Sequence, residues 1–146
     1  MRKITMLLAT VGAMLLLVSG VALAATINGT SGHDTLRGGE GTDTIHGRGG
    51  SDTIHGGYGK DRLYGDTGND TLRGGHAQDR IFGGQGRDIV DGEQGNDYVN
   101  VADGTVDSVS CGVGANDTAV VDIADLGSNS FEDFVRLSSC ENTMVR

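Results

Sequence analysis

Residues 29–100 read GTSGHDTLR, GGEGTDTIH, GRGGSDTIH, GGYGKDRLY, GDTGNDTLR, GGHAQDRIF, GGQGRDIVD and GEQGNDYVN, eight nine-residue units without a gap. Glycine fills the first position of every unit and the fourth position of all but one, where Ala77 stands. Aspartate fills every sixth position, and an aliphatic residue fills every eighth. This unbroken period predicts a repeat architecture in which each unit stacks on its neighbours.

Within each unit the residue types predict a turn followed by a short strand. Glycines gather in the first four positions, where a tight turn requires a positive φ or a close approach of backbone. Thr, Ile, Tyr and Phe are frequent in the seventh to ninth positions and suit strands. We expect two units to form one coil with the eighth side chain inward. The core is then two facing columns of single aliphatic side chains, too thin to offset the chain entropy alone.

The sixth-position aspartates are the candidate metal ligands. They are Asp34, Asp43, Asp52, Asp61, Asp70, Asp79, Asp88 and Asp97. Stacking of alternate units brings their carboxylates to about the 4.8 Å spacing of neighbouring strands, which is repulsive without a counter-ion. Calcium accepts about six to eight carboxylate and carbonyl oxygens in flexible geometry, whereas magnesium retains water and zinc prefers Cys or His. The sequence therefore predicts calcium between the turns.

Stacking of alternate units defines how many ions the turns can hold. The pairs are Asp34/Asp52, Asp52/Asp70 and Asp70/Asp88 on one edge, and Asp43/Asp61, Asp61/Asp79 and Asp79/Asp97 on the other. We therefore expect up to about six inter-turn sites. The alternative is that the aspartates only form turns. A preference for turns does not explain why aspartate stands at the sixth position of all eight units. Asp107 and Asp117, in the less regular sequence after residue 100, are further candidate ligands.

The unit resembles the nonapeptide G-G-x-G-x-D-x-U-x of RTX (repeats-in-toxin) calcium-binding proteins, the hemolysin-type calcium-binding repeat. This resemblance covers residues 29–100. It implies an all-β fold, a right-handed parallel β-roll of eight units, each a six-residue turn followed by a three-residue strand. The stretch VDSVSCGVGANDTAVVDIAD (106–125), with Ser-Cys-Glu at 139–141, resembles the cap of small secreted bacterial calcium-binding proteins. We expect the β-roll over residues 25–100, and degenerate repeats with an irregular cap over residues 101–146.

The first 24 residues predict a secretory signal peptide. Arg2 and Lys3 precede an uncharged apolar run, Ile4 to Val18, and Ala22-Leu23-Ala24 matches an A-x-A cleavage signal. The run is shorter than the roughly 20 residues that cross a bilayer, which disfavours the alternative of an uncleaved anchor. We therefore expect a secreted, extracellular chain that starts at Ala25 and has no membrane span.

Cys111 and Cys140 are the two cysteines of the chain. An even pair in an oxidising compartment predicts a disulfide. Two buried free thiols are the alternative.

The formal net charge of −9 argues against nucleic acid as a partner and favours cations. Residues 25–146 leave little room for the protease, lipase or toxin domain of many RTX proteins, so we expect a calcium-binding monomer without enzymatic activity. Two alternatives remain open. Arg62, Tyr64, Arg80 and Phe82 lie on one outward face of the expected coil and could form an adhesive or glycan-binding surface, although cross-strand pairing alone also explains them. The chain could also be an accessory or a remnant of an RTX hydrolase.

Overall fold

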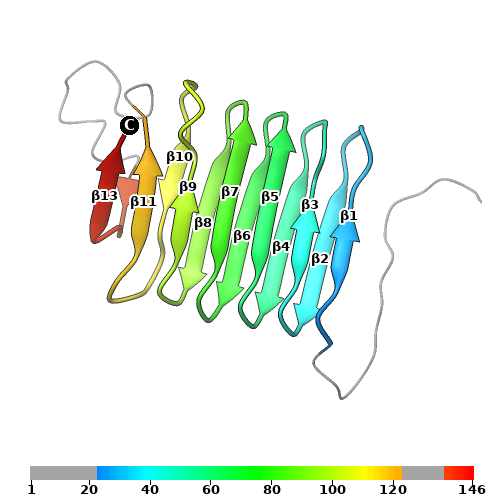
Figure 1. The fold of residues 1–146 in the computed structure, drawn as a ribbon, viewed down its shortest axis with the longest axis horizontal. Coiled ribbons are helices and arrows are strands. Elements are labelled where there is room, and N and C mark those ends of the chain that lie inside the picture. The colour runs from blue at the N-terminus through cyan, green and yellow to red at the C-terminus, as the bar shows by residue number, and fades with distance from the viewer. Residues whose placement is uncertain (1–22, 123–136) are drawn as a thin grey trace, which may run out of the picture.

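A computed structural model describes residues 23–122 and 137–146, which form a solenoid of stacked β-coils (Figure 1). Most of the predicted leader, residues 1–22, lies outside the described residues. The strands are β1 (Thr26–Asn28), β2 (Thr35–Glu40), β3 (Thr44–His46), β4 (Thr53–Tyr58), β5 (Arg62–Thr67), β6 (Thr71–His76), β7 (Arg80–Gln85), β8 (Ile89–Gln94), β9 (Tyr98–Asn100), β10 (Ser108–Ser110), β11 (Thr118–Val121), β12 (Leu137–Ser138) and β13 (Asn142–Val145).

The strands form two parallel sheets that face each other across a narrow core. The odd-strand sheet has the order β1-β3-β5-β7-β9-β11-β13, and the even-strand sheet has the order β12-β10-β8-β6-β4-β2. Each unit pairs with the second unit after it; Leu36, for example, is in register with Ile54. The predicted all-β parallel β-roll is thus confirmed.

In most units the strand is longer than the expected three residues. Six strands are six residues long, because they continue through the first three positions of the following unit. In β4 and β6, for example, Gly57 pairs with Gly75 and Tyr58 with His76. The glycines at the first two positions allow neighbouring backbones to remain close past the ninth position.

The core consists of the predicted eighth-position aliphatics. Seven of them are at most 1% exposed, namely Ile45, Ile54, Leu63, Leu72, Ile81, Val90 and Val99. Leu36 and Ile27 belong to the first described coil and are only partly buried, because none of the described residues forms a coil beyond them. Within the eight regular units, apolar burial is therefore limited to a single row of side chains from each sheet, and Val101, Cys111 and Val121 add to the core only after residue 100.

Both sheets continue after residue 100, although the nine-residue period is broken there. Ser108 is in register with Ile89, and Thr118 is in register with both Tyr98 and Asn142. The extra residues lengthen the turns and leave the strand register unchanged. Where the structure describes it, the C-terminal segment therefore adds short strands to both sheets, with irregular stretches between them. None of the described residues belongs to a helix that could cross a membrane.

Candidate metal centres

The sixth-position aspartates form two hydrogen-bonded ladders. In each ladder the backbone N–H of one aspartate donates to Oδ1 of the aspartate one coil further on, at N···Oδ1 distances of 2.7–2.8 Å. The Asp43 ladder precedes the odd strands and contains Asp43, Asp61, Asp79, Asp97 and Asp117. The Asp52 ladder precedes the even strands and contains Asp34, Asp52, Asp70, Asp88 and Asp107. The structure thus brings together all ten aspartates that the sequence selects.

The second carboxylate oxygen of most of these aspartates is buried without a hydrogen bond. This holds for Oδ2 of Asp43, Asp52, Asp61, Asp70, Asp79, Asp88, Asp97 and Asp117. Each of these residues is at most 2% exposed. Burial of an ionised carboxylate is costly unless a cation or a hydrogen-bond donor compensates for it. At these eight aspartates the second oxygen is therefore an unsatisfied acceptor, for which a cation would compensate.

Backbone carbonyl oxygens converge on the same buried oxygens. A Cβ added to Gly56 would lie 2.5 Å from both Asp61 Oδ2 and the carbonyl oxygen of Gly74. One coil further on, a Cβ on Gly74 would lie 2.6 Å from Asp79 Oδ2 and from the Gly92 carbonyl oxygen. The first-position glycine therefore keeps open a space lined by a carboxylate and by a carbonyl of the next coil.

This donor set fits calcium. Among the described residues, no three His, Cys, Asp or Glu side chains converge to hold a metal, so a cation in the ladders must also use backbone carbonyls. Carboxylate and carbonyl oxygens are the hard ligands that calcium accepts, and zinc would require nitrogen or sulfur.

The pKa values of the ladder carboxyls are raised above their ordinary value of 3.8. They rise to about 8 for Asp79, about 7 for Asp88, and about 6 for Asp61, Asp70 and Asp97. Burial is the largest cause, the N–H donor of the preceding coil partly opposes it, and a neighbouring ladder aspartate raises the pKa further. Without metal, the carboxyl of Asp79 favours a proton at neutral pH and that of Asp88 is close to half protonated, whereas Asp61, Asp70 and Asp97 take up protons only under mildly acidic conditions.

We expect the calcium-free coil to become more stable on acidification. Because the folded-state pKa of Asp79 is about 8 and that of Asp88 about 7, protons bind the folded chain more tightly than the unfolded chain. The stabilisation is complete below about pH 4 and is lost as the pH rises through about 6 to 8. Circular dichroism of calcium-depleted protein between pH 4 and 8 measures it. The double variant Asp79→Asn/Asp88→Asn should gain less stability on acidification than the parent. A β-signal that increases with pH contradicts the expectation.

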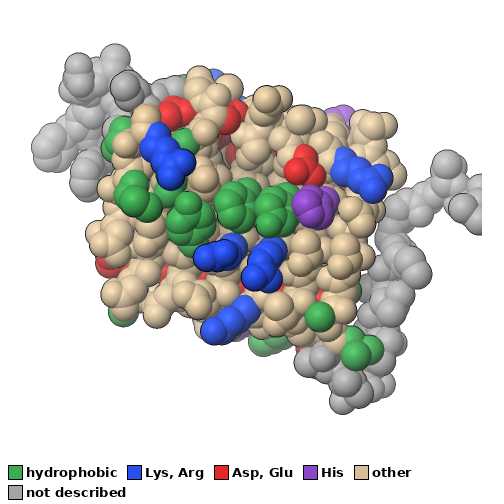
Figure 2. Space-filling model, in the orientation of Figure 1, with side chains coloured by type: hydrophobic (Ala, Val, Ile, Leu, Met, Phe, Trp, Pro, Cys, Tyr) green, Lys and Arg blue, Asp and Glu red, His purple; other side chains and the backbone are tan. Residues whose placement is uncertain are grey.

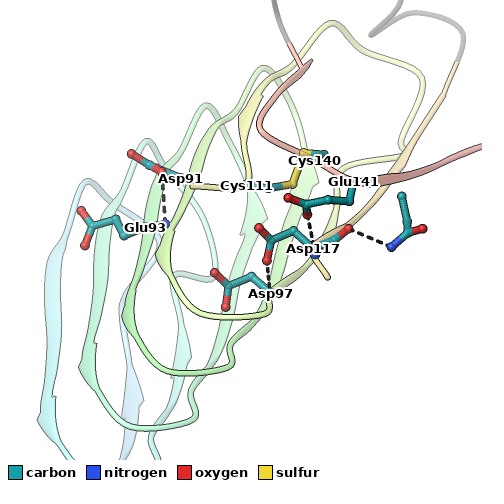
Figure 3. The surroundings of a disulfide bond; sticks show 8 residues. Asp91, Glu93, Asp97, Cys111, Asp117, Cys140 and Glu141 are labelled. Carbon is teal, nitrogen blue, oxygen red and sulfur yellow. Dashed lines mark hydrogen bonds between the residues drawn. A yellow bond between two sulfur atoms is a disulfide. The ribbon is translucent and has the colours of Figure 1, made fainter. Parts of the chain in front are cut away.

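The ladders end on residues that the repeat pattern does not reveal. At the N-terminal end, Oδ2 of Asp34 accepts hydrogen bonds from Thr30 N and Oγ1, at 2.6 and 2.9 Å. Asp34 therefore differs from the other aspartates, because its second oxygen already has partners. At the other end, the N–H of Asp117 donates to Glu141 Oε2 at 2.7 Å (Figure 3). Threonine fills the second position of a unit only at Thr30, and Glu141 lies outside the repeats. The nine-residue period therefore gives no signal for either residue.

A disulfide lies beside this last rung. Cys111 and Cys140 are bonded, which confirms the predicted pair. The bond joins the segment after β10 to the segment before β13, and Cys140 directly precedes Glu141 (Figure 3). In the loop-entropy view a disulfide with this sequence separation of 29 stabilises the fold by about 3–4 kcal/mol.

The comparisons with known proteins agree with this geometry. A family model described as RTX calcium-binding nonapeptide repeat (4 copies) matches residues 19–54, 46–76, 55–90, 64–99 and 77–105. These overlapping segments cover more than half of the 146 residues. No curated protein and no solved structure matches the chain.

Proposed function

The chain belongs to the family of RTX calcium-binding nonapeptide repeats, and on this premise we propose that it is an exported, non-enzymatic protein whose coil folds on calcium bound between its Gly/Asp turns. The buried Oδ2 oxygens without hydrogen bonds carry this proposal. Bound calcium would supply the positive charge that the ladders lack, and the buried Oδ2 oxygens would be among its ligands.

The residues proposed to hold calcium are the ladder aspartates, together with carbonyls of the glycine turns. They are Asp43, Asp52, Asp61, Asp70, Asp79, Asp88 and Asp97, extended by Asp107 and Asp117. Asp34 is a weaker candidate, because its Oδ2 accepts two hydrogen bonds from Thr30. The one-residue-wide core makes folding depend on this charge compensation, so metal binding and folding are coupled.

Calcium titration of the exported protein tests the proposal. We expect calorimetry to give several ions per chain, up to about six from the inter-turn pairs, with β-signal appearing in the same calcium range. Magnesium at the same concentration is the control and should give little β-signal, because it keeps its water ligands. A β-signal unchanged by chelation at neutral pH contradicts the proposal.

Ligand binding to the odd-strand sheet is a second candidate function, supported by a groove along the Asp43 ladder. The groove has a volume of about 630 Å³, and Lys60, Arg62 and Arg80 are among its lining residues. Asp61, Asp79 and Asp97 also line it. These three basic residues are exposed, and Figure 2 shows basic side chains beside the row of aromatic and histidine rings on this face. Once calcium neutralises the aspartates, the groove is positive and suits an acidic polysaccharide.

The aromatic rings of this face are poorly placed to stack on a sugar. Tyr64 stacks on His46 at a ring-centroid distance of 4.4 Å and on Phe82 at 5.0 Å, with the planes nearly parallel. Both faces of the Tyr64 ring are therefore covered by neighbouring rings. A ligand would meet ring edges there, so the basic groove is the better recognition surface.

Heparin binding tests this second candidate, with dextran as the neutral comparison. We expect calcium-dependent heparin binding that weakens about tenfold in the triple variant Lys60→Gln/Arg62→Gln/Arg80→Gln. Arg37→Gln/Arg73→Gln is the control, because these exposed arginines belong to the even-strand sheet. Equal loss in both variants would indicate non-specific charge attraction, and absence of binding with calcium present would remove this candidate.

A further inference from the structure

The backbone of Ala25 occupies the first position of the Asp43 ladder. Its N–H donates to Asp43 Oδ1 at 2.7 Å, within the range of the aspartate rungs. Its carbonyl accepts from Thr44 N at 2.8 Å, as the Asp43 carbonyl accepts from Arg62 N at 2.8 Å. Ala25 is thus the backbone equivalent of a ladder aspartate without the carboxylate.

The residues before Ala25 continue the turn that would precede it. A Cβ on Gly41 would lie 2.7 Å from the carbonyl oxygen of Leu23. In the following coil, the Gly41 carbonyl approaches Gly59 from the same direction. Leu23 therefore stands in the fourth position of an incomplete unit, and a cut after Ala24 removes Leu23 and Ala24 while leaving β1 paired with β3.

The expected signal-peptide cleavage site coincides with this point in the ladder. Ala22-Leu23-Ala24 predicts a cut that leaves Ala25 as the first residue. The nitrogen that donates to Asp43 then becomes an α-ammonium group. Asp43 is 0% exposed, and its Oδ2 has no hydrogen bond.

We propose that leader removal places the α-ammonium of Ala25 on the Asp43 carboxylate, where it closes the N-terminal end of the ladder. An ammonium carries three donors and a full positive charge, so it forms a stronger, charge-assisted bond where the precursor has a neutral amide. The chain's own terminus takes the place of a metal ion at this end, because cleavage removes the turn whose carbonyls would complete a site. This inference rests on the proposed export, since it requires the leader to be cleaved.

The two ladders then end in different ways at the same end of the solenoid. Thr30 closes the Asp52 ladder through its hydroxyl and amide on Asp34. The Asp43 ladder is closed by charge, and only in the processed chain. Processing thereby stabilises the coil end on which β1 and β2 have one strand neighbour each.

The test uses the full-length gene in a secreting bacterial host. N-terminal sequencing of the exported protein should give Ala25. A variant with Gly-Ser inserted between Ala24 and Ala25 keeps the Ala25 amide but moves the ammonium two residues away. With saturating calcium, we expect its folding equilibrium constant to fall about tenfold. In the Asp43→Asn background the same insertion should have little effect.

Amine acylation gives a second readout that does not depend on the Asp43 variant folding. The processed chain has one lysine, Lys60, which is exposed and serves as the internal reference. In the folded exported protein we expect acylation at Lys60 with Ala25 protected, and in the insertion variant both amines should react. An exported protein with a different first residue overturns this inference and leaves the export standing, whereas an uncleaved chain retained in the cells overturns both. If Ala25 is first, equal stability and equal amine reactivity in the two proteins overturn this inference alone.

Discussion

Replacing Asp79 by asparagine is expected to have opposite effects with and without calcium. Asp79 lies in the middle of its ladder, where Oδ1 accepts the Asp61 N–H and Oδ2 lies buried near the Gly92 carbonyl. Asparagine has the same shape and can still accept the Asp61 N–H, but folding of the variant requires neither a buried charge nor the uptake of a proton at this position. In chelator at neutral pH the variant should therefore be more stable than the parent. With calcium it should lose an anionic ligand and bind the neighbouring ions about 100-fold more weakly.

Calorimetric calcium titration and urea unfolding, each with and without calcium, measure both effects. Glu40→Gln is the control, because it removes one negative charge from an exposed side chain outside the ladders. It should change neither quantity appreciably. Unchanged calcium stoichiometry and affinity in Asp79→Asn would show that the ladder aspartates are not ligands.

Alanine at Gly56 should destabilise the calcium-bound protein strongly. The new Cβ would lie 2.5 Å from Asp61 Oδ2 and 2.5 Å from the Gly74 carbonyl oxygen. One is a buried carboxylate and the other is backbone of a packed coil, so neither has room to move. We expect a loss of about 3 kcal/mol in the free energy of unfolding, at the upper end of the range for overpacking, and a weaker affinity for calcium at this turn.

Gly32→Ala is the matched control for this glycine. The nearest atom to a Cβ on Gly32 is Thr30 Oγ1 at 3.7 Å, an ordinary van der Waals contact, and the φ of Gly32 is not in the left-handed region. Urea unfolding in saturating calcium should place Gly32→Ala within about 0.5 kcal/mol of the parent. Similar losses of unfolding free energy at both positions would show that the space beside Asp61 does not require glycine.

The repeat period was sufficient to predict the sheets and the two ladders, since both depend on features that recur in every unit. The eighth-position aliphatics determine the register, and the register places each aspartate beside the one a coil away. For the same reason Asp107 and Asp117 join the ladders despite irregular spacing. Their strands keep the register through Val109 and Ala119, which are buried in the core.

Features that depend on a single residue or on backbone approach were not predictable in this way. The strands extend through Gly57 and Tyr58 because glycine brings two backbones together, whereas the sequence indicated turns there. Thr30 and Glu141 complete the ladders from positions that carry no repeat signal. The stacking of Tyr64 between His46 and Phe82 requires side-chain orientations that a column of ninth-position residues does not specify.

Because Cys140 directly precedes Glu141, we expect assembly of the C-terminal end to respond to both disulfide formation and calcium. Glu141 completes the last rung of the ladder, and the covalent bond of its neighbour holds it there. Oxidation thus reduces the entropy lost when that rung forms, while calcium neutralises the charge that the rung brings inward. We therefore expect disulfide formation and calcium binding to favour each other, and the final coil to assemble fully only where both an oxidant and calcium are present.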